Sequence, residues 1–453
     1  MVQQHKITSR PLAKALGSAS ILSMAIVGAN AANAIQTDVG VDYRAQAFAV
    51  SSEAFGDAGS STDTDTGLAH LLRVKADFKH EETGVSLHTS TELAGDRWTG
   101  DGGRYSADSG NGSTGQTGAY NTSNTGDNVR LDLAYAQIPF SNGATLRVGR
   151  QAANWSNCFL VCDDRRDRVL GLIPTSVGTA LAIYDRRQDT TQFHNEDNGD
   201  MAGLGLVTKL GGFNVGLLYV HWFKEANEES IAPDDPDDPA PYALSGTHLF
   251  SPYISGQLGD NLNLTTGFTF VTGGSTTHPV NEDQYFNENA WSEYVRFGMS
   301  AGGVQFNLQG LAAQDGGLIS GGFETYSSLI NSSPESTESP TSLVRMGSGL
   351  GLKDYNEYLV SAQAVIPVGN QLSFKVGVGT YNVDNGTDDD SSTFVDLQAH
   401  YKLNEAVSTS LTWGMLTKND VAITAGNSLA PAGGHSFADD DLMAASANIY
   451  VKF

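Results

Sequence analysis

The ten residues 394–403, Phe-Val-Asp-Leu-Gln-Ala-His-Tyr-Lys-Leu, decide the fold class. From Val395 to Leu403 an apolar side chain stands at every second position, and polar or charged side chains stand between them. Successive side chains of a β-strand point to opposite faces of the sheet. The alternation therefore predicts a strand with one apolar face and one polar face.

The same alternation returns in other parts of the chain, for example in residues 72–79, 85–93 and 304–312. Soluble sandwiches and propellers also alternate, but a sandwich core cannot bury the charges that these polar faces carry. A water-filled lumen can accommodate them, and short joints that alternate with long polar loops are typical of outer-membrane barrels. We therefore predict an all-β fold, a transmembrane antiparallel β-barrel.

Counting these segments predicts sixteen strands, an even number as a closed antiparallel barrel requires. Residues 179–190 leave an alternative open, because they extend the sixth strand, belong to a loop, or add a hairpin and make eighteen strands. The predicted strands are 36–49, 67–79, 84–95, 128–139, 144–151, 201–210, 213–224, 246–258, 262–273, 290–301, 304–313, 355–367, 371–383, 393–403, 407–417 and 442–453.

Residues 1–34 have the organisation of a signal peptide, which leaves 35–453 as the barrel domain. Lys6, Arg10 and Lys14 form a basic start, an apolar stretch follows, and Ala32-Asn33-Ala34 gives a small-residue cleavage site. The apolar stretch is shorter than the about 20 residues that a membrane-spanning helix needs. The sequence thus predicts an exported protein.

Composition excludes several other classes. There are 26 Lys and Arg against 51 Asp and Glu, a net charge of −25, and such a surface repels nucleic acid. Hydrophobic residues make up 40% and charged residues 17% of the chain, which fits neither a disordered polyanion nor a helical membrane protein.

The end of the chain, Ala-Asn-Ile-Tyr-Val-Lys-Phe at 447–453, is an alternating strand with a terminal Phe. This ending resembles the outer-membrane β-barrel family, and the hairpin 129–150, with Thr-Leu-Arg-Val-Gly-Arg-Gln at 145–151 before a long loop, resembles the general porins of Gram-negative bacteria. The resemblance implies a sixteen-stranded barrel in the bacterial outer membrane, a third long loop folded into the pore, and a homotrimer. It implies no cofactor.

The third long loop, residues 152–200, is the candidate pore constriction. A barrel of this size leaves an aqueous channel, and charges at its narrowest point set selectivity. In porins the inward loop commonly faces a ladder of basic residues on the first strands, so we expect two opposed groups. The acids are Asp163, Asp164 and Asp167, and the basic residues with lumen-facing parity are Arg44, Arg73, Lys75, Arg130 and Arg147. The alternative is that arginines and acids pair with one another on a wet wall.

Two cysteines, Cys158 and Cys162, lie in the same loop. In the oxidising compartment of an exported protein they predict a local disulfide, while a metal pair is the weaker alternative because no third ligand lies near. The acidic runs 234–238, 388–390 and 439–441 permit calcium binding, although none has the spacing of an EF-hand loop. A solvated rim that contacts lipopolysaccharide through divalent ions is the simpler interpretation. No metal site is predicted.

The aromatic residues permit two interpretations, a girdle at the membrane boundary or a sugar-binding track in the lumen. Tyr43, Tyr135, Tyr401, Trp413 and Phe453 have outward parity, as expected of the girdles at a membrane boundary. A sugar-stacking track would need inward aromatics, and that parity belongs to Phe48, Tyr294, Tyr381 and Tyr450.

An enzyme is not predicted, because the chain lacks a Gly-x-Ser-x-Gly elbow, a His-Glu-x-x-His motif and a phosphate loop. His88 and His400 have inward parity, and a serine beside either would make a Ser–His pair, although a lumen histidine is more often a wall residue. The predicted function is passive diffusion of small hydrophilic solutes. The alternatives are a channel specific for a sugar, phosphate or carboxylate, an outer-membrane hydrolase, and an adhesin.

Overall fold

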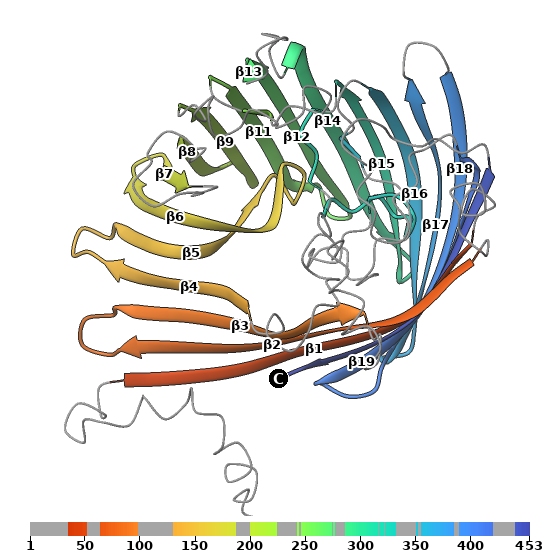
Figure 1. Cartoon of the computed structure of the whole chain (residues 1–453), viewed down its shortest axis with the longest axis horizontal. Coiled ribbons are helices and arrows are strands. Elements are labelled where there is room, and N and C mark those ends of the chain that lie inside the picture. Colours follow the sequence, from red (N-terminus) through yellow and green to blue (C-terminus); the bar gives the residue numbers. More distant parts are fainter. Residues whose placement is uncertain are drawn as a thin grey trace, which may run out of the picture.

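The computed structural model forms one closed ring of antiparallel strands (Figure 1). Eighteen strands make the ring, each hydrogen-bonded to the next along the chain, and the last strand, β20, pairs with the first, β1. The predicted signal peptide lies outside the described residues. The structure describes residues 35–51, 64–97, 130–186, 200–223, 242–243, 246–273, 275–276, 286–315, 317–320, 322–331, 350–351, 355–384, 389–419 and 440–453.

The strands of the ring differ in length, and two short strands, β10 and β13, pair with each other outside it. Their bounds are β1 Ile35–Ser51, β2 Thr64–His80, β3 Ser86–Arg97, β4 Arg130–Pro139, β5 Thr145–Trp155, β6 Val161–Thr175, β7 Gly178–Arg186, β8 Met201–Leu210, β9 Phe213–Trp222, β10 Tyr242–Ala243, β11 His248–Leu258, β12 Leu262–Gly273, β13 Ser275–Thr276, β14 Phe286–Ala301, β15 Val304–Gln314, β16 Asn356–Val368, β17 Leu372–Asp384, β18 Asp389–Lys402, β19 Val407–Asn419 and β20 Asp440–Lys452.

The count of sixteen strands is wrong, and the alternative of an added hairpin and eighteen strands is confirmed, with the hairpin at residues 161–186. Strands β6 and β7 pair along their length and join β5 to β8. Within the predicted third long loop, 152–200, the structure thus shows the turn 156–160 followed by strands β6 and β7, while residues 187–199 lie outside the described residues. The charged run 163–168 concealed β6, because charges on both faces of a strand break the alternation that marks the other strands.

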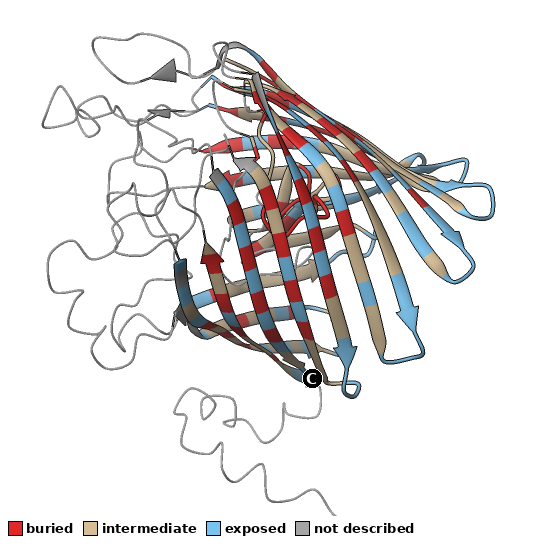
Figure 2. Ribbon diagram, turned by 90° about the vertical axis from the view of Figure 1, so that its right-hand side faces the viewer, coloured by how far each residue is buried: buried red, intermediate tan, exposed pale blue. Residues whose placement is uncertain are grey.

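Alternation along the strands is confirmed by burial. On β18 the outward Val395 and Leu397 are 43% and 45% exposed, whereas Phe394 between β17 and β19 is 2% exposed. Figure 2 shows the same buried and exposed bands along neighbouring strands. The apolar exposed face suits lipid, and ring closure pairs the backbone groups of both edge strands. Among the described residues no helix is long and apolar enough to cross a membrane.

Part of the space inside the ring is filled by the chain itself. Residues 317–320 and 322–331, which follow β15, form what we call the inner segment, and most of its residues are buried. Its apolar side chains join lumen-facing residues of β1, β2 and β14–β20 in one cluster. The cluster includes Phe323, Leu329 and Ile330 of the inner segment and Phe48, Leu71, Tyr294, Leu311, Leu359, Tyr381, Phe394, Leu416 and Leu442 of the strands.

Candidate functional site

The turn between β5 and β6 reaches strands that are not its neighbours in the sheet. Trp155 Nε1 donates to the carbonyl of Ser251 on β11 at 3.0 Å, and Asn157 Nδ2 donates to the hydroxyl of Tyr294 on β14 at 3.1 Å. That hydroxyl in turn donates to the carbonyl of Ser156 at 3.0 Å. Because β11 and β14 lie elsewhere on the ring, these contacts run through its interior.

The predicted disulfide is present in this turn. Cys158 and Cys162 are joined with an S–S distance of 2.08 Å. Phe159 between them packs on Tyr294, with ring centroids 4.5 Å apart, and is fully buried. The disulfide therefore closes a short loop whose central side chain anchors the turn to β14.

The inner segment meets this turn in the interior of the ring. The amide of Ser320 donates to the carbonyl of Phe159 at 2.7 Å, and the rings of Phe159 and Phe323 meet edge to face at 4.9 Å. The guanidinium of Arg296 on β14 lies 5.1 Å from the centre of the Phe323 ring. The two inward elements thus form one continuous structure, with Arg296 beside their contact.

The far end of the inner segment is anchored to the wall. The amide and hydroxyl of Ser328 both donate to Oδ2 of Asp396 on β18, the amide at 2.6 Å. Inside the segment, Asn331 donates to the carbonyls of Ser320 and Phe323 at 2.8 and 3.0 Å. These hydrogen bonds hold the segment as a unit against β17–β19.

Three wall glycines give the two inward elements room to approach. A Cβ atom at Gly377 would lie 2.2 Å from the carbonyl oxygen of Tyr326, and one at Gly414 would lie 2.7 Å from Oγ of Ser328. At Gly267 of β12 a Cβ would lie 2.3 Å from Oγ of Ser156. Side chains larger than hydrogen at these positions conflict with the observed placement.

The predicted acids of the constriction pair with arginines of their own neighbourhood. Asp163 contacts Arg165 at 2.7 Å, and Asp164 contacts Arg166. Asp167 lies 3.6 Å from Arg150 of β5. In the described part of the chain, no ion pair joins these acids to the predicted basic ladder.

Among the predicted basic residues, Arg44 pairs with Asp42 at 3.2 Å, and Arg73 contacts Glu92 and Asp132 at 3.3 and 3.7 Å. Asp132 is also contacted by Arg165 at 2.6 Å, so the wall and the turn share one carboxylate. The other ladder residues are less constrained. Arg147 donates to Oε1 of Gln137 at 2.8 Å, Lys75 is exposed, and Arg130 lies in register with Glu92 but its side chain is outside the described residues.

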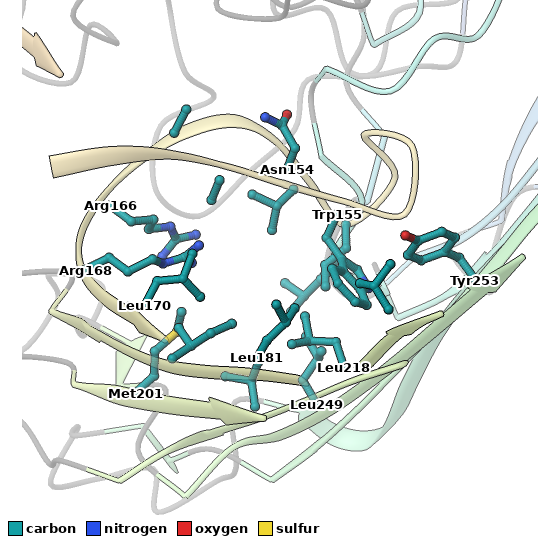
Figure 3. A pocket seen from close by; sticks show the side chains of 18 of the residues that line it. Asn154, Trp155, Arg166, Arg168, Leu170, Leu181, Met201, Leu218, Leu249 and Tyr253 are labelled. Carbon is teal, nitrogen blue, oxygen red and sulfur yellow. The ribbon is translucent and has the colours of Figure 1, made fainter. Parts of the chain in front are cut away.

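A cavity of about 510 Å³ lies between the β5–β6 hairpin, strands β7, β8, β9 and β11, and Leu318 and Ile319 of the inner segment (Figure 3). Arg166 and Arg168 stand on one side of it, and Leu181, Leu218 and Leu249 stand on the other. Arg147, Trp155, Trp222, Tyr253 and further apolar residues complete the lining. The cavity thus combines an apolar side with a side of two arginines, which are paired with Asp164 and Asp185.

The polar atoms of this cavity are mainly hydrogen-bond donors. Arg168 is committed to Asp185, which it contacts through two bonds of 2.6 Å. Nε1 of Trp222 and Nε of Arg166 are buried and have no hydrogen-bond partner in the described structure. Unsatisfied buried donors cost free energy unless a ligand or water accepts from them.

This cavity was not predicted from the sequence. Its apolar residues occupy the lumen-facing positions of β7 and β9, where polar residues were expected. The available signal was two runs, 180–184 and 215–220, which are apolar on both faces. A strand with apolar residues on both faces indicates contact with lipid outside and with an apolar surface inside.

The aromatic predictions have mixed outcomes. Tyr401, Trp413 and Phe453 are exposed on the outer face, as expected. Tyr135 instead stacks on the lumen-facing His88, with centroids 4.7 Å apart. Phe48, Tyr294 and Tyr381 face inward, but they are at most 5% exposed and lie in the apolar cluster.

The acidic runs lie mostly outside the described residues. Among described residues, no group of three or more His, Cys, Asp or Glu side chains is placed to hold a metal ion.

No protein-family model matches the chain, and no curated protein matches it in sequence. Several solved structures share its architecture. OccAB3 of Acinetobacter baumannii is 12% identical, with a TM-score of 0.55, over 92% of this chain and 100% of that chain. OccK2 (OpdF) of Pseudomonas aeruginosa is 10% identical, with a TM-score of 0.55, over 92% and 98%. OpdK of the same organism, solved with vanillate, is 11% identical, with a TM-score of 0.52, over 92% and 98%.

At these identities the likeness shows a shared fold. The chain has the closed antiparallel barrel fold of outer-membrane porins, with eighteen strands.

Proposed function

We propose that this chain is an outer-membrane channel through which small hydrophilic solutes diffuse. The observation that carries the proposal is the closed ring with an apolar outer face and a lumen that holds arginines and carboxylates. Barrels of 16–18 strands are wide enough to leave an aqueous channel. No energy source or cofactor is needed.

In this proposal residues 1–34 direct export and are removed, and the barrel works as a homotrimer with its outer rim beside lipopolysaccharide. The β5–β6 turn, as the inward-folded third loop, and the inner segment together narrow the lumen. The contact between Phe159 and Phe323 supports this role, because it keeps both elements in the path of a solute.

In the proposed constriction the predicted charged residues have other partners than the sequence suggested. Arg73 and Arg165 converge on Asp132, so part of the positive charge of the ladder is neutralised. Arg147 and Lys75 remain the ladder cations whose charge a passing solute meets, since neither forms an ion pair in the described part of the chain. The lumen is therefore expected to favour anions.

Planar-bilayer recording tests both the channel activity and the sign of its ion selectivity. We expect stepwise conductance and a reversal potential that indicates anion preference in a salt gradient. Arg147→Gln should shift that potential toward cations, whereas Arg150→Gln, which changes an arginine paired with Asp167, serves as the matched control. Absence of conductance from folded protein would refute the channel, and unchanged reversal potential in the Arg147 variant would refute its part in selectivity.

A second candidate is a substrate-specific channel, and the donor-rich cavity favours it. Arg166 and Trp222 offer unsatisfied donors opposite an apolar wall, an arrangement suited to an anion with an apolar body. The fold neighbour OpdK was solved with vanillate, which makes vanillate a reasonable probe. A general channel should pass vanillate without saturation.

The test measures block of ionic current by vanillate and by an uncharged amide of the same shape. Loss of one hydrogen bond to a charged group costs about 1.5–3 kcal/mol. Arg166→Gln should therefore weaken vanillate block by about 10- to 100-fold and leave the amide unaffected. Equal block by both compounds would favour the general channel.

A further inference from the structure

A serine, a histidine and an aspartate form a hydrogen-bonded chain on the lumen face of β2 and β3. Oγ of Ser86 lies 2.8 Å from Nε2 of His88, and Nδ1 of His88 lies 2.7 Å from Oδ1 of Asp77. Ser86 and His88 are two residues apart on β3, so their side chains share one face. Asp77 is the direct register partner of His88 on β2. Sheet geometry alone therefore brings the three groups together.

The two ring nitrogens of His88 have different partners, which defines a direction for proton transfer. A carboxylate accepts only, so Nδ1 carries the proton that is shared with Asp77. In the neutral imidazole Nε2 then accepts from the hydroxyl of Ser86. A nucleophile, a base and a carboxylate that orients the base constitute the arrangement that activates serine in hydrolases, and it is defined by geometry rather than by sequence order.

We propose that Ser86, His88 and Asp77 form a catalytic triad that hydrolyses small carboxylic esters inside the lumen. This activity is independent of the channel function. It also differs from the sequence-based expectation, which left a Ser–His pair open but had no means to place Asp77 beside it.

The surroundings fix the histidine ring and leave Asp77 and His88 partly exposed to the lumen. Tyr135 of β4 stacks on the His88 ring with an interplanar angle of 18° and limits its rotation. The side chains of Asp77 and His88 are 51% and 26% exposed. Ser86 itself is 7% exposed, and its backbone lies within the sheet between β2 and β4. The exposed groups are thus the carboxylate and the imidazole, and an ester has to reach the buried Ser86 past the face of the His88 ring that Tyr135 leaves open.

Donors for a developing oxyanion stand next to Ser86. Gln137 is the register partner of Ser86 on β4, and directly opposed side chains in a sheet begin about 5 Å apart. Arg147 donates through Nε to Oε1 of Gln137, which turns the amide so that its NH₂ group remains as a donor. Lys79 is the partner of Ser86 on β2. These donors and cations favour esters that carry negative charge.

Each step of the reaction is balanced by groups of the cluster and water. Oγ of Ser86 forms a bond to the acyl carbon while its proton passes to Nε2 of His88. The ester C–O bond breaks, and His88 gives the proton to the leaving oxygen, which departs as the alcohol. Water then attacks the acyl-serine with His88 as base, and the carboxylic acid leaves as Ser86 recovers its proton. One ester and one water give one acid and one alcohol.

Hydrolysis of p-nitrophenyl acetate by purified folded barrel in detergent tests the proposal. We expect turnover above the solvent rate, with a loss of about 100-fold or more in Ser86→Ala and His88→Asn because general-base and nucleophilic groups contribute at this level. His400→Asn, which changes a lumen histidine on β18, and Ser90→Ala, which changes the next inward serine on β3, are the matched controls. Both controls should hydrolyse the ester at the wild-type rate.

A fluorophosphonate probe gives a readout that is independent of turnover. It should attach to Ser86 in wild type and not in His88→Asn, and peptide mass spectrometry locates the adduct. Heat-modifiable migration on gels, measured on every variant, confirms that the barrel is folded. Hydrolysis at the solvent rate by folded wild type, or equal rates in wild type and Ser86→Ala, would overturn the proposal, and so would labelling at another serine.

Discussion

Gly377 of β17 should control where the inner segment sits in the lumen. An alanine there adds a Cβ that would lie 2.2 Å from the carbonyl oxygen of Tyr326, whereas Cβ contacts under 3.0 Å essentially do not occur. The backbone of the inner segment must therefore withdraw by at least 3.0 − 2.2 = 0.8 Å. Backbone on the strand side cannot yield, because β17 is paired with β16 and β18.

The withdrawal has a cost that the structure allows us to bound. Moving the segment as a unit by 0.8 Å lengthens the 2.6 Å bond from the Ser328 amide to Asp396 to about 3.4 Å, beyond the usual range. A hydrogen bond to a charged group contributes about 1.5–3 kcal/mol and overpacking costs about 1–3 kcal/mol. We expect Gly377→Ala to weaken docking of the inner segment by about 2.5–6 kcal/mol.

Single-channel recording is the assay. Release of the inner segment from β17 should raise the unitary conductance and add current fluctuations in Gly377→Ala. Gly310→Ala on β15 is the control, because its added Cβ would meet Val295 at an ordinary 3.8 Å. If Gly377→Ala has the same conductance and the same thermal unfolding as wild type, the glycine does not position the segment.

Three further predictions concern stability. Arg168→Met should destabilise the barrel by about 3–5 kcal/mol in urea unfolding, because it leaves the fully buried Asp185 without its arginine; a variant as stable as wild type would contradict this. Replacing Cys158 and Cys162 with serine should cost about 2 kcal/mol and abolish any effect of reductant on thermal unfolding. Burial raises the pKa of Tyr326 to about 12, so its stabilising contribution is complete below pH 10 and is lost as pH rises through about 12. Difference absorbance between wild type and Tyr326→Phe should show tyrosinate forming only near that upper pH.

The fold followed from the sequence wherever one face of a strand meets lipid and the other meets water. Strand β18 is an example, because Val395 and Leu397 alternate with polar residues and burial follows the same pattern. Strand β6 was not predicted from the sequence, because charged residues lie on both of its faces. Asp163, Arg165 and Asp167 lie on one face, and Asp164, Arg166 and Arg168 lie on the other. The run therefore lacks the period-two alternation that marks a strand.

The candidate site was less predictable than the fold. The disulfide was predicted because it depends on local spacing. The partners of Asp163, Asp164 and Asp167 were not, because a carboxylate pairs with the nearest guanidinium in space, and two of these guanidiniums belong to the same strand. The inner segment escaped prediction altogether, since its burial depends on β17–β19, which lie later in the chain.

The pairing of β1 with β20 joins residues about four hundred positions apart. The amide of Val41 donates to the carbonyl of Phe453 at 2.7 Å, and the amide of Phe453 donates back at 3.1 Å. Until those last residues arrive, β1 and β19 each have an open hydrogen-bonding edge, and open edges are templates for aggregation. Ring closure with so long a sequence separation is also intrinsically slow. A chain shortened by its final strand should thus be lost as misassembled material before insertion, rather than persist as a leaky pore.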